Sequence, residues 1–213
     1  MGCFAAGCIT ILVIGFFLCV GAAGTAWYVC RKAADVLTST EPVDLKLPPT
    51  DQAQIRAAEG SVSRLKTAIS THQEATVGFS ASDLNALIHR DPDLDEMRDR
   101  IRIDIADSIM TISVSAPLDG IHWRRLHGRW LNGSTSFKFN YTSGVFDVDF
   151  KSVEANGREM SESFLSGFNP SFSDAFSNKF REQVRKNDMG EFWDRVKSIR
   201  LEEDKLVITT ESD

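Results

Sequence analysis

The sequence predicts an α+β domain of antiparallel β-hairpins packed with amphipathic helices, preceded by one transmembrane helix. Three observations lead to this prediction: a charge-free apolar N-terminal segment, pairs of short segments in which apolar and polar residues alternate, and segments in which apolar residues recur every three or four positions. Strands grouped in hairpins, with helices outside that run, are typical of α+β domains and not of an alternating parallel sheet. We therefore expect a transmembrane anchor (1–30), a stalk (31–50) and one soluble α+β domain (51–213).

The N-terminal segment has the composition of a membrane-spanning helix. Residues 1–30 contain no Asp, Glu, Lys or Arg, although the chain has 24 Lys and Arg and 30 Asp and Glu. The apolar run is longer than the roughly 20 residues that a helix needs to cross the hydrocarbon core. Trp27 and Tyr28, followed by Arg31 and Lys32, predict an interfacial belt at headgroup depth. A cleaved signal peptide is the alternative, because small residues lie at a suitable spacing within 20–26, but the segment lacks a basic start.

Two features give opposite indications about the side of the membrane on which the domain lies. Arg31 and Lys32 favour the cytoplasm by the positive-inside rule. A first apolar segment commonly serves as an export signal, which favours an extracytoplasmic domain. We expect a single-pass membrane protein whose domain lies outside the cytoplasm.

Net charge and cysteine usage argue against two classes of protein. The net charge of −6 belongs to the soluble part, whereas a general nucleic-acid binder needs a basic surface to displace counterions. The four cysteines all lie in or beside the apolar segment, at Cys3, Cys8, Cys19 and Cys30. The domain therefore has no disulfide framework.

Helices are predicted where apolar residues share one face and a capping residue precedes them. Thr50 or Asp51 begins the first helix, and Ser80 and Asp83 have the spacing of a capping box at the start of a short helix that ends before Pro92. A third helix begins at 169–170, and a last helical piece holds residues 192–196. The apolar stripes are Ile55, Ala58, Val62, Leu65 and Ile69 in the first helix, and Phe172, Phe176, Phe180 and Val184 in the third.

Three hairpins are predicted from alternating apolar and polar residues. The first joins 101–105 to 110–116 across Asp107 and Ser108, the second joins 137–141 to 146–150, and the third joins 199–201 to 205–210. The second hairpin and the third helix are rich in Phe. We interpret these aromatic faces as core, with an apolar groove for an acyl chain as the alternative.

The segment 122–130, His-Trp-Arg-Arg-Leu-His-Gly-Arg-Trp, is the candidate contact site. Indole rings lie well at a membrane interface, and guanidinium groups bind phosphates. Stacking on single-stranded nucleic acid is less suited to an acidic domain beside a bilayer. The alternative is an ordinary edge strand or connecting loop, with Trp in the core and Arg stems along the surface. The candidate contact residues are Trp123, Arg124, Arg125, Arg129 and Trp130.

Catalytic and metal-binding patterns are not found. Three Asp within 91–95 match the start of a calcium loop, but Glu96 replaces its glycine and Arg102 stands where a bidentate Glu is needed. His122 and His127 have no third ligand at a suitable spacing. Neither a Gly-x-Ser-x-Gly elbow nor a phosphate loop is present. We expect no enzymatic activity, no cofactor and no metal.

The segment 79–88, Phe-Ser-Ala-Ser-Asp-Leu-Asn-Ala-Leu-Ile, resembles the Ser/Thr-x-x-x-Leu-Asn-x-Leu motif of YpmS-like bacterial proteins. These proteins are similar to this chain in plan, with one N-terminal anchor, a helix, and twisted antiparallel hairpins outside the membrane. The resemblance implies a bacterial, membrane-anchored, extracytoplasmic domain related to tubular lipid-binding folds. It brings no catalytic residues.

The leading hypothesis is a non-enzymatic, bitopic membrane protein whose domain binds lipid, an envelope component or a protein near the bilayer. The anchor, the aromatic faces and the segment 122–130 lead to it. The alternative is a structural or assembly subunit that docks a protein partner through the same surface. An uncharacterised hydrolase comes third, and nucleic acid is not an expected partner.

Overall fold

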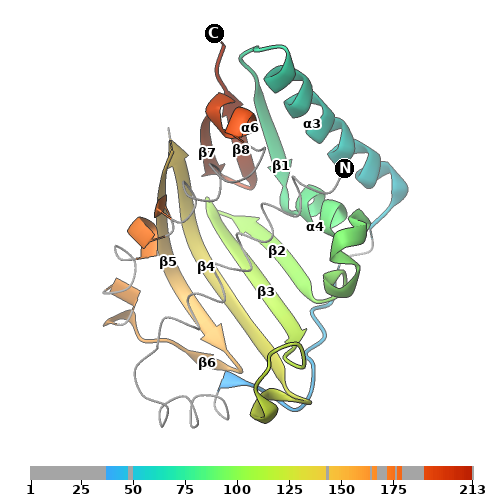
Figure 1. The fold of residues 1–213 in the computed structure, drawn as a ribbon, viewed down its shortest axis with the longest axis vertical. Coiled ribbons are helices and arrows are strands. Elements are labelled where there is room, and N and C mark those ends of the chain that lie inside the picture. The colour runs from blue at the N-terminus through green and yellow to red at the C-terminus, as the bar shows by residue number, and fades with distance from the viewer. Residues whose placement is uncertain are drawn as a thin grey trace.

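The computed structural model describes residues 37–47, 50–142, 144–163, 165–166, 172–175, 177–178 and 190–212. Within them it is an α+β domain with an open antiparallel sheet of eight strands and few helices (Figure 1). The predicted α+β class of the soluble part is confirmed at this level. The predicted anchor (1–30) lies outside the described residues, and none of the helices within them has the length and apolar character needed to cross a membrane.

The strand β4 is central to the sheet. One of its edges pairs first with β3 and then, near its end, with β7, while its other edge pairs with β5. The strand order is β1-β8-β7-β4-β3-β2, with β5 beside β4 and β6 beside β5. In chain order the elements are α3 (Gln52–Ser70), β1 (Thr76–Ser80), α4 (Ala81–Arg90), the 3-10 helix η1 (Pro92–Met97), β2 (Ile101–Ala106), β3 (Ile109–Pro117), the 3-10 helix η2 (Arg124–Leu126), β4 (Trp130–Thr142), β5 (Val145–Ala155), β6 (Arg158–Glu159), α6 (Gly190–Arg195), β7 (Val196–Glu202) and β8 (Lys205–Thr210).

The first two predicted helices are confirmed together with their caps. The Asp51 side chain accepts a hydrogen bond from the N–H of Gln54 at the start of α3. The capping box of α4 is closed in both directions, because Ser80 N–H donates to Asp83 (2.9 Å) and Asp83 N–H donates to the Ser80 hydroxyl (3.2 Å). The predicted stripe of α3 faces the core, with Ile55, Ala58, Leu65 and Ile69 buried.

All three predicted hairpins are present. Asp107 and Ser108 join β2 to β3, and both have positive φ (53° and 58°), as tight hairpin turns require. The strands β4 and β5 form the longest pair, and β7 and β8 form the third hairpin. One boundary was predicted wrongly, since Val196 begins β7 and does not extend the last helix.

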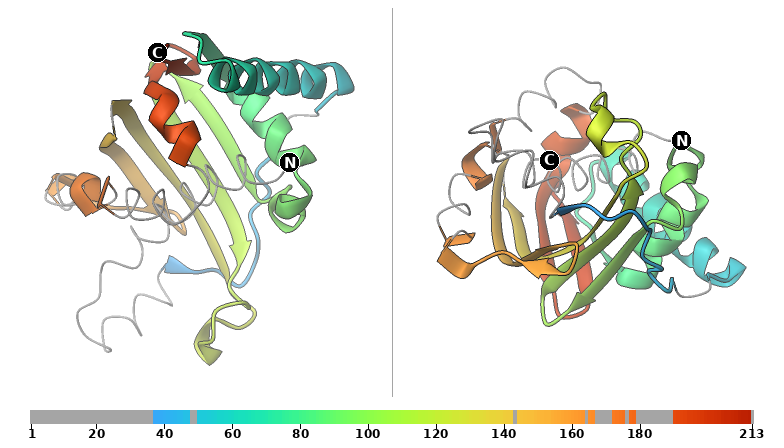
Figure 2. Two further views of the ribbon diagram at one scale, coloured as in Figure 1. Left: turned by 45° about the horizontal axis from the view of Figure 1, so that its top comes forward. Right: turned by 90° about the horizontal axis from the view of Figure 1, so that it is seen from below.

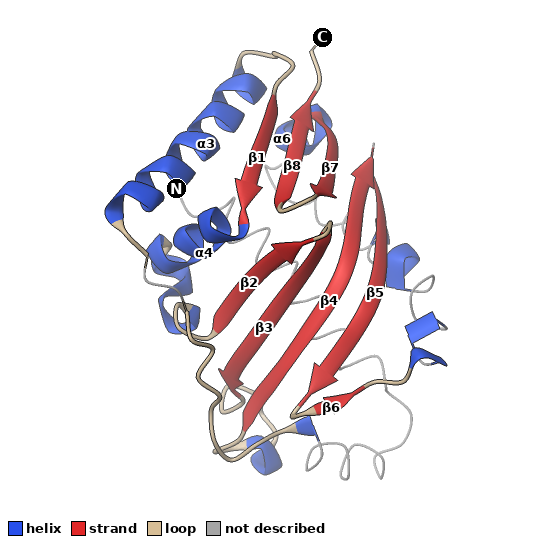
Figure 3. Ribbon diagram, turned by 180° about the vertical axis from the view of Figure 1, so that it is seen from behind, coloured by secondary structure: helices blue, strands red, loops and turns tan. Residues whose placement is uncertain are grey.

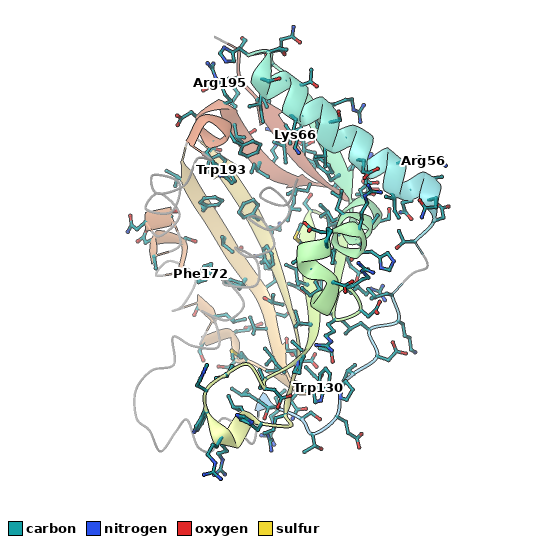
Figure 4. All side chains as sticks on the ribbon, turned by 45° about the vertical axis from the view of Figure 1, so that its right-hand side comes forward. Arg56, Lys66, Trp130, Phe172, Trp193 and Arg195 are labelled. Carbon is teal, nitrogen blue, oxygen red and sulfur yellow. The ribbon has the colours of Figure 1, made fainter. Side chains whose placement is uncertain are left out.

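The core lies on one face of the sheet. Aromatic side chains of β4, β5 and α6 meet there with Phe172, and ring centroids lie 4.9 Å apart for Phe150 and Phe172 and 5.5 Å apart for Tyr141 and Trp193 (Figure 4). The interpretation of the aromatic faces as core is confirmed for these residues, whereas Phe176 and Phe180 lie outside the described part. Figure 2 shows α6 on this face of the sheet.

The opposite face of the sheet is polar. Figure 3 shows β2, β3, β4 and β5 from behind, with no described helix crossing them. The residues whose side chains point to this face alternate with the buried ones, and the hydroxyls of Thr111 and Ser136 lie 2.8 Å apart on neighbouring strands. This alternation explains why one face alone carries the core.

Candidate functional site

The candidate residues lie in the connection between β3 and β4, residues 118–129, which we name the β3–β4 loop. Its two ends are joined where Leu118 N–H donates to the carbonyl of Arg129 (2.9 Å). The Asp119 carboxylate accepts from Gly128 N–H (2.7 Å), and Gly128 has a φ of 68°, a conformation that favours glycine. The loop is therefore shaped by its own hydrogen bonds and lies at the lower end of the sheet in Figure 1.

A small apolar cluster supports the base of this loop. Leu118, Leu126 and Leu131 are buried, and the half-buried Trp123 packs against them. The cluster is separate from the main core of the sheet. Trp123 is therefore used mainly for packing within the loop.

Two further candidate residues contact the domain itself. The half-buried Trp130 begins β4, and the guanidinium of Arg100 lies 5.3 Å from the centroid of its ring (Figure 4). Arg129 donates from Nη2 to the carbonyl of Thr38 (3.0 Å) and from Nε to the Thr38 hydroxyl. The structure thus places Arg129 and Trp130 at the root of the loop.

The tip of the loop presents cationic and apolar side chains to solvent. Arg124 and Arg125 are exposed, as are His122 and His127. Ile121 is 40 % exposed, which makes it one of the few large apolar residues on the described surface. Asp119 is the sole acidic residue between 118 and 130, and its carboxylate accepts the bond from Gly128. The tip therefore combines positive charge with an exposed aliphatic chain.

The start of the described chain is attached beside this loop. Ser39 and Trp130 exchange two backbone hydrogen bonds, of 2.8 and 2.7 Å. The carbonyl of Thr38 accepts from Arg129 and also from the side-chain amide of Asn156 (3.2 Å). Thr38 is buried as a result. These contacts fix the point at which the preceding residues reach the domain, and we name them the Thr38 clamp.

The following residues also lie against the domain. The N–H of Val43 donates to Ser115 (3.0 Å) and to Asn132 (3.2 Å), and the Arg102 guanidinium donates to the carbonyls of Leu45 and Lys46, each at 3.3 Å. Residues 38–46, which belong to the predicted stalk, are therefore held to the sheet by hydrogen bonds, although most of their side chains are exposed. No sequence signal indicated this, because the partners lie far away along the chain. The domain boundary at residue 50 stays a prediction.

Within the part of the chain that the structure describes, no group of three or more His, Cys, Asp or Glu side chains is placed to hold a metal ion. Of the three acids at 91–95, Asp91 is buried, and Asp95 forms an ion pair with Arg98 (2.7 Å). His122 and His127 are both exposed in the β3–β4 loop.

Three outcomes follow for the predicted site residues. Arg124 and Arg125 lie together at the tip, whereas Trp123, Arg129 and Trp130 have roles in holding the loop. Sequence reasoning missed Ile121 and Thr38, although a lone Ile after Asp119 and Gly120 could have signalled an exposed apolar residue in a turn. The predicted belt of Trp27, Tyr28, Arg31 and Lys32 lies outside the described residues.

The sequence matches no protein-family model, and comparison with curated proteins and with solved structures found no match either.

Proposed function

We propose that this chain is a non-enzymatic, single-pass membrane protein whose domain binds a component of the bilayer surface beside its own anchor. The observation that carries the proposal is the Thr38 clamp. It attaches the chain that follows the predicted anchor directly to the base of the β3–β4 loop. The end of the domain that bears this loop is therefore the end nearest to the membrane.

The length of chain between anchor and clamp supports this orientation. Eight residue steps separate Cys30, the last residue of the predicted anchor, from Thr38, and a fully extended chain spans at most about 29 Å over that length. The opposite end of the sheet is farther away, because the 13 residues of β4 extend over about 40 Å. A domain held in this way keeps the β3–β4 loop toward the bilayer.

The distribution of charge supports a bilayer component as the ligand. The chain as a whole has a net charge of −6, yet the loop carries three Arg against one Asp between 118 and 130. Its exposed arginines favour anionic headgroups, which attract basic groups near a membrane surface. The loop is therefore a locally cationic segment of a chain that is acidic as a whole.

Energy transfer from the two ends of the sheet to the membrane surface tests the orientation. All four natural cysteines are replaced by Ser, and one new cysteine for a donor dye is introduced at Gly120, in the loop, or at Val145, at the far end of β4. A side chain at Gly120 meets no other atom within 4 Å, and Val145 is 53 % exposed, so both positions accept a label. The full chain is reconstituted in nanodiscs with acceptor dyes on lipid headgroups.

We expect strong transfer from position 120 and weak transfer from position 145. Equal transfer from both positions, or stronger transfer from 145, contradicts the proposal. A chain that does not insert into nanodiscs contradicts the anchor itself.

A further inference from the structure

We infer that the tip of the β3–β4 loop is a binding site for the phosphate groups of an anionic bilayer, with Ile121 entering the interfacial layer between headgroups. This inference rests on the proposed function and adds the ligand class and the contacting residues. It assigns contact to Ile121, Arg124 and Arg125, and a supporting role to Trp123, Arg129 and Trp130.

The division between contacting and supporting residues follows from the geometry of the loop. Trp123 packs on the cluster of Leu118, Leu126 and Leu131, so its ring is held within the loop. Arg129 is bound to Thr38. The exposed side chains that project between these supports are Ile121, Arg124 and Arg125, flanked by His122 and His127. An exposed aliphatic side chain next to cations is the composition with which peripheral segments enter a headgroup layer.

The loop is organised before it meets a ligand. The hydrogen bond from Gly128 N–H to Asp119 closes it, and the N–H of Leu126 donates to the carbonyl of Trp123 (2.8 Å) inside η2. The bond to Gly128 also places the one acidic group of the loop at its base. A preorganised loop loses little conformational freedom on binding, which favours association.

A bilayer fits this site better than a free anion does. The predicted anchor precedes the Thr38 clamp, so a bilayer is already within reach of the loop. Arg124 and Arg125 are exposed at a projecting tip, which suits a laterally extended array of phosphates. Ile121 gains from a partly apolar layer and gains nothing from a dissolved phosphate ion.

Depth-dependent quenching in the full chain tests the inference. The cysteine-replaced chain carries an environment-sensitive dye at Gly120→Cys, next to the intact Ile121, and the nanodiscs contain lipids with a nitroxide near the headgroup. One set of nanodiscs is zwitterionic, and the other contains equal parts of phosphatidylglycerol and phosphatidylcholine. The variants are Arg124→Ala/Arg125→Ala and Ile121→Ser, with Lys138→Ala/Lys205→Ala as a control that removes two exposed positive charges from the sheet.

We expect strong quenching in anionic nanodiscs and weaker quenching in zwitterionic ones. High salt is expected to weaken the quenching in anionic nanodiscs. Loss of two arginines lowers the equilibrium constant for docking about thirtyfold at low salt, since each basic residue near an anionic surface contributes a factor of about five. Ile121→Ser lowers the quenching in both kinds of nanodisc, and the lysine control matches the unaltered chain.

Four results overturn the inference. The first is quenching that is the same in both kinds of nanodisc and in both loop variants, and the second is a loss of quenching in the lysine control as large as in the arginine variant. The third is abolition of quenching by millimolar inorganic phosphate at constant ionic strength. The fourth is quenching that appears only when a protein partner is added. If energy transfer still places position 120 near the bilayer in these cases, the proposed function stands and only the lipid site fails. If energy transfer fails as well, both fall together.

Discussion

Asn85 of α4 makes two hydrogen bonds to the backbone of Ile103 on β2. Its Nδ2 donates to the Ile103 carbonyl (2.7 Å), and its Oδ1 accepts from the Ile103 N–H (2.9 Å). One side-chain amide thus satisfies both backbone groups of an edge-strand residue, as a neighbouring strand would. Asn85 is also the Asn of the segment 79–88, Phe-Ser-Ala-Ser-Asp-Leu-Asn-Ala-Leu-Ile. The structure gives that position a physical role in closing the edge of the sheet.

Asn85→Ala is expected to destabilise the domain by about 1–3 kcal/mol, because it leaves the Ile103 N–H and C=O without these bonds. Asn85→Asp is expected to be at least as damaging, since a carboxylate cannot donate to the Ile103 carbonyl. Urea unfolding of the full chain in detergent, followed by tryptophan fluorescence, measures both. Asn140→Ala, at an exposed position on β4, is the control and is expected to change stability by less than about 0.5 kcal/mol. Equal stability of the Asn85 and Asn140 variants would show that α4 closes the edge by packing alone.

The edge of β5 is closed by two serines. The Ser173 hydroxyl bonds to both the N–H (3.0 Å) and the carbonyl (3.1 Å) of Val148, and Ser177 bonds in the same way to Phe146 (3.0 and 3.3 Å). The double substitution Ser173→Ala/Ser177→Ala is expected to accelerate amide exchange at Val148 and Phe146 by at least tenfold, because each amide loses this acceptor.

Hydrogen exchange with mass spectrometry measures this change peptide by peptide. The matched control is Ser166→Ala, since the Ser166 hydroxyl is exposed and donates to the nearby carbonyl of Ser163. Unchanged exchange in peptides that cover 145–149 of the double variant contradicts the assigned role of the two serines. The same variant is expected to aggregate faster, because an open strand edge is a template for pairing.

The phenol of Tyr141 is expected to make the domain less stable at high pH. Burial raises the pKa of the phenol above its ordinary value of about 10, and the charges of Asp194 and Glu211 act in the same direction, while a hydrogen bond from the Gly144 backbone opposes them. A folded-state pKa above the unfolded one means that the folded state keeps its proton longer. This contribution to stability is complete below about pH 10 and is lost as the pH rises through the folded-state pKa.

Tyr141→Phe removes this titration. The free energy of unfolding of the unaltered chain, measured relative to that of the variant, should therefore fall as the pH rises above 10. Urea unfolding at pH 8, 10 and 11 measures this difference, and the titration of lysines cancels in the comparison. A difference that is constant over this range would falsify the assignment to Tyr141.

The bonds from Arg129 to Thr38 are expected to help hold the orientation of the domain to the bilayer. Arg129→Ala removes the bonds to Thr38, so the domain is held less firmly beside its anchor. Energy transfer from position 120 is expected to fall, although Arg124 and Arg125 are unchanged. Arg129→Lys is expected to behave nearly as Ala does, because one ammonium group cannot reproduce the fork of a guanidinium. Transfer that is unaffected by either change contradicts a role of the clamp in orientation.

Features set by neighbouring residues were predictable from the sequence. The capping box of Ser80 and Asp83 and the turn at Asp107 and Ser108 each need a few consecutive residues, and both are present. Alternation also identified the strands of the three hairpins. By contrast, β1 is only five residues long and contains Gly78, and it is a strand because β8 pairs with it from near the other end of the chain. No local pattern carries that information.

The candidate loop shows the same division. Its cationic and aromatic composition was evident from the sequence, but adjacent residues turned out to have different roles. Trp123 packs against the leucine cluster, whereas the neighbouring Arg124 points to solvent. The roles depend on the direction of each side chain in η2 and on the Thr38 clamp, in which Arg129 and Asn156 lie 91 and 118 positions from Thr38 in the chain. Composition alone contains neither fact.

Photo-crosslinking with a headgroup-modified lipid tests the orientation of the domain most directly, since it uses the unaltered full chain. The chain is reconstituted in anionic nanodiscs that contain a lipid with a diazirine on its headgroup, irradiated, and digested for mass spectrometry. We expect adducts within the domain to concentrate in peptides that cover 118–130. Adducts that concentrate at 140–149, or that spread evenly over the domain, would contradict it.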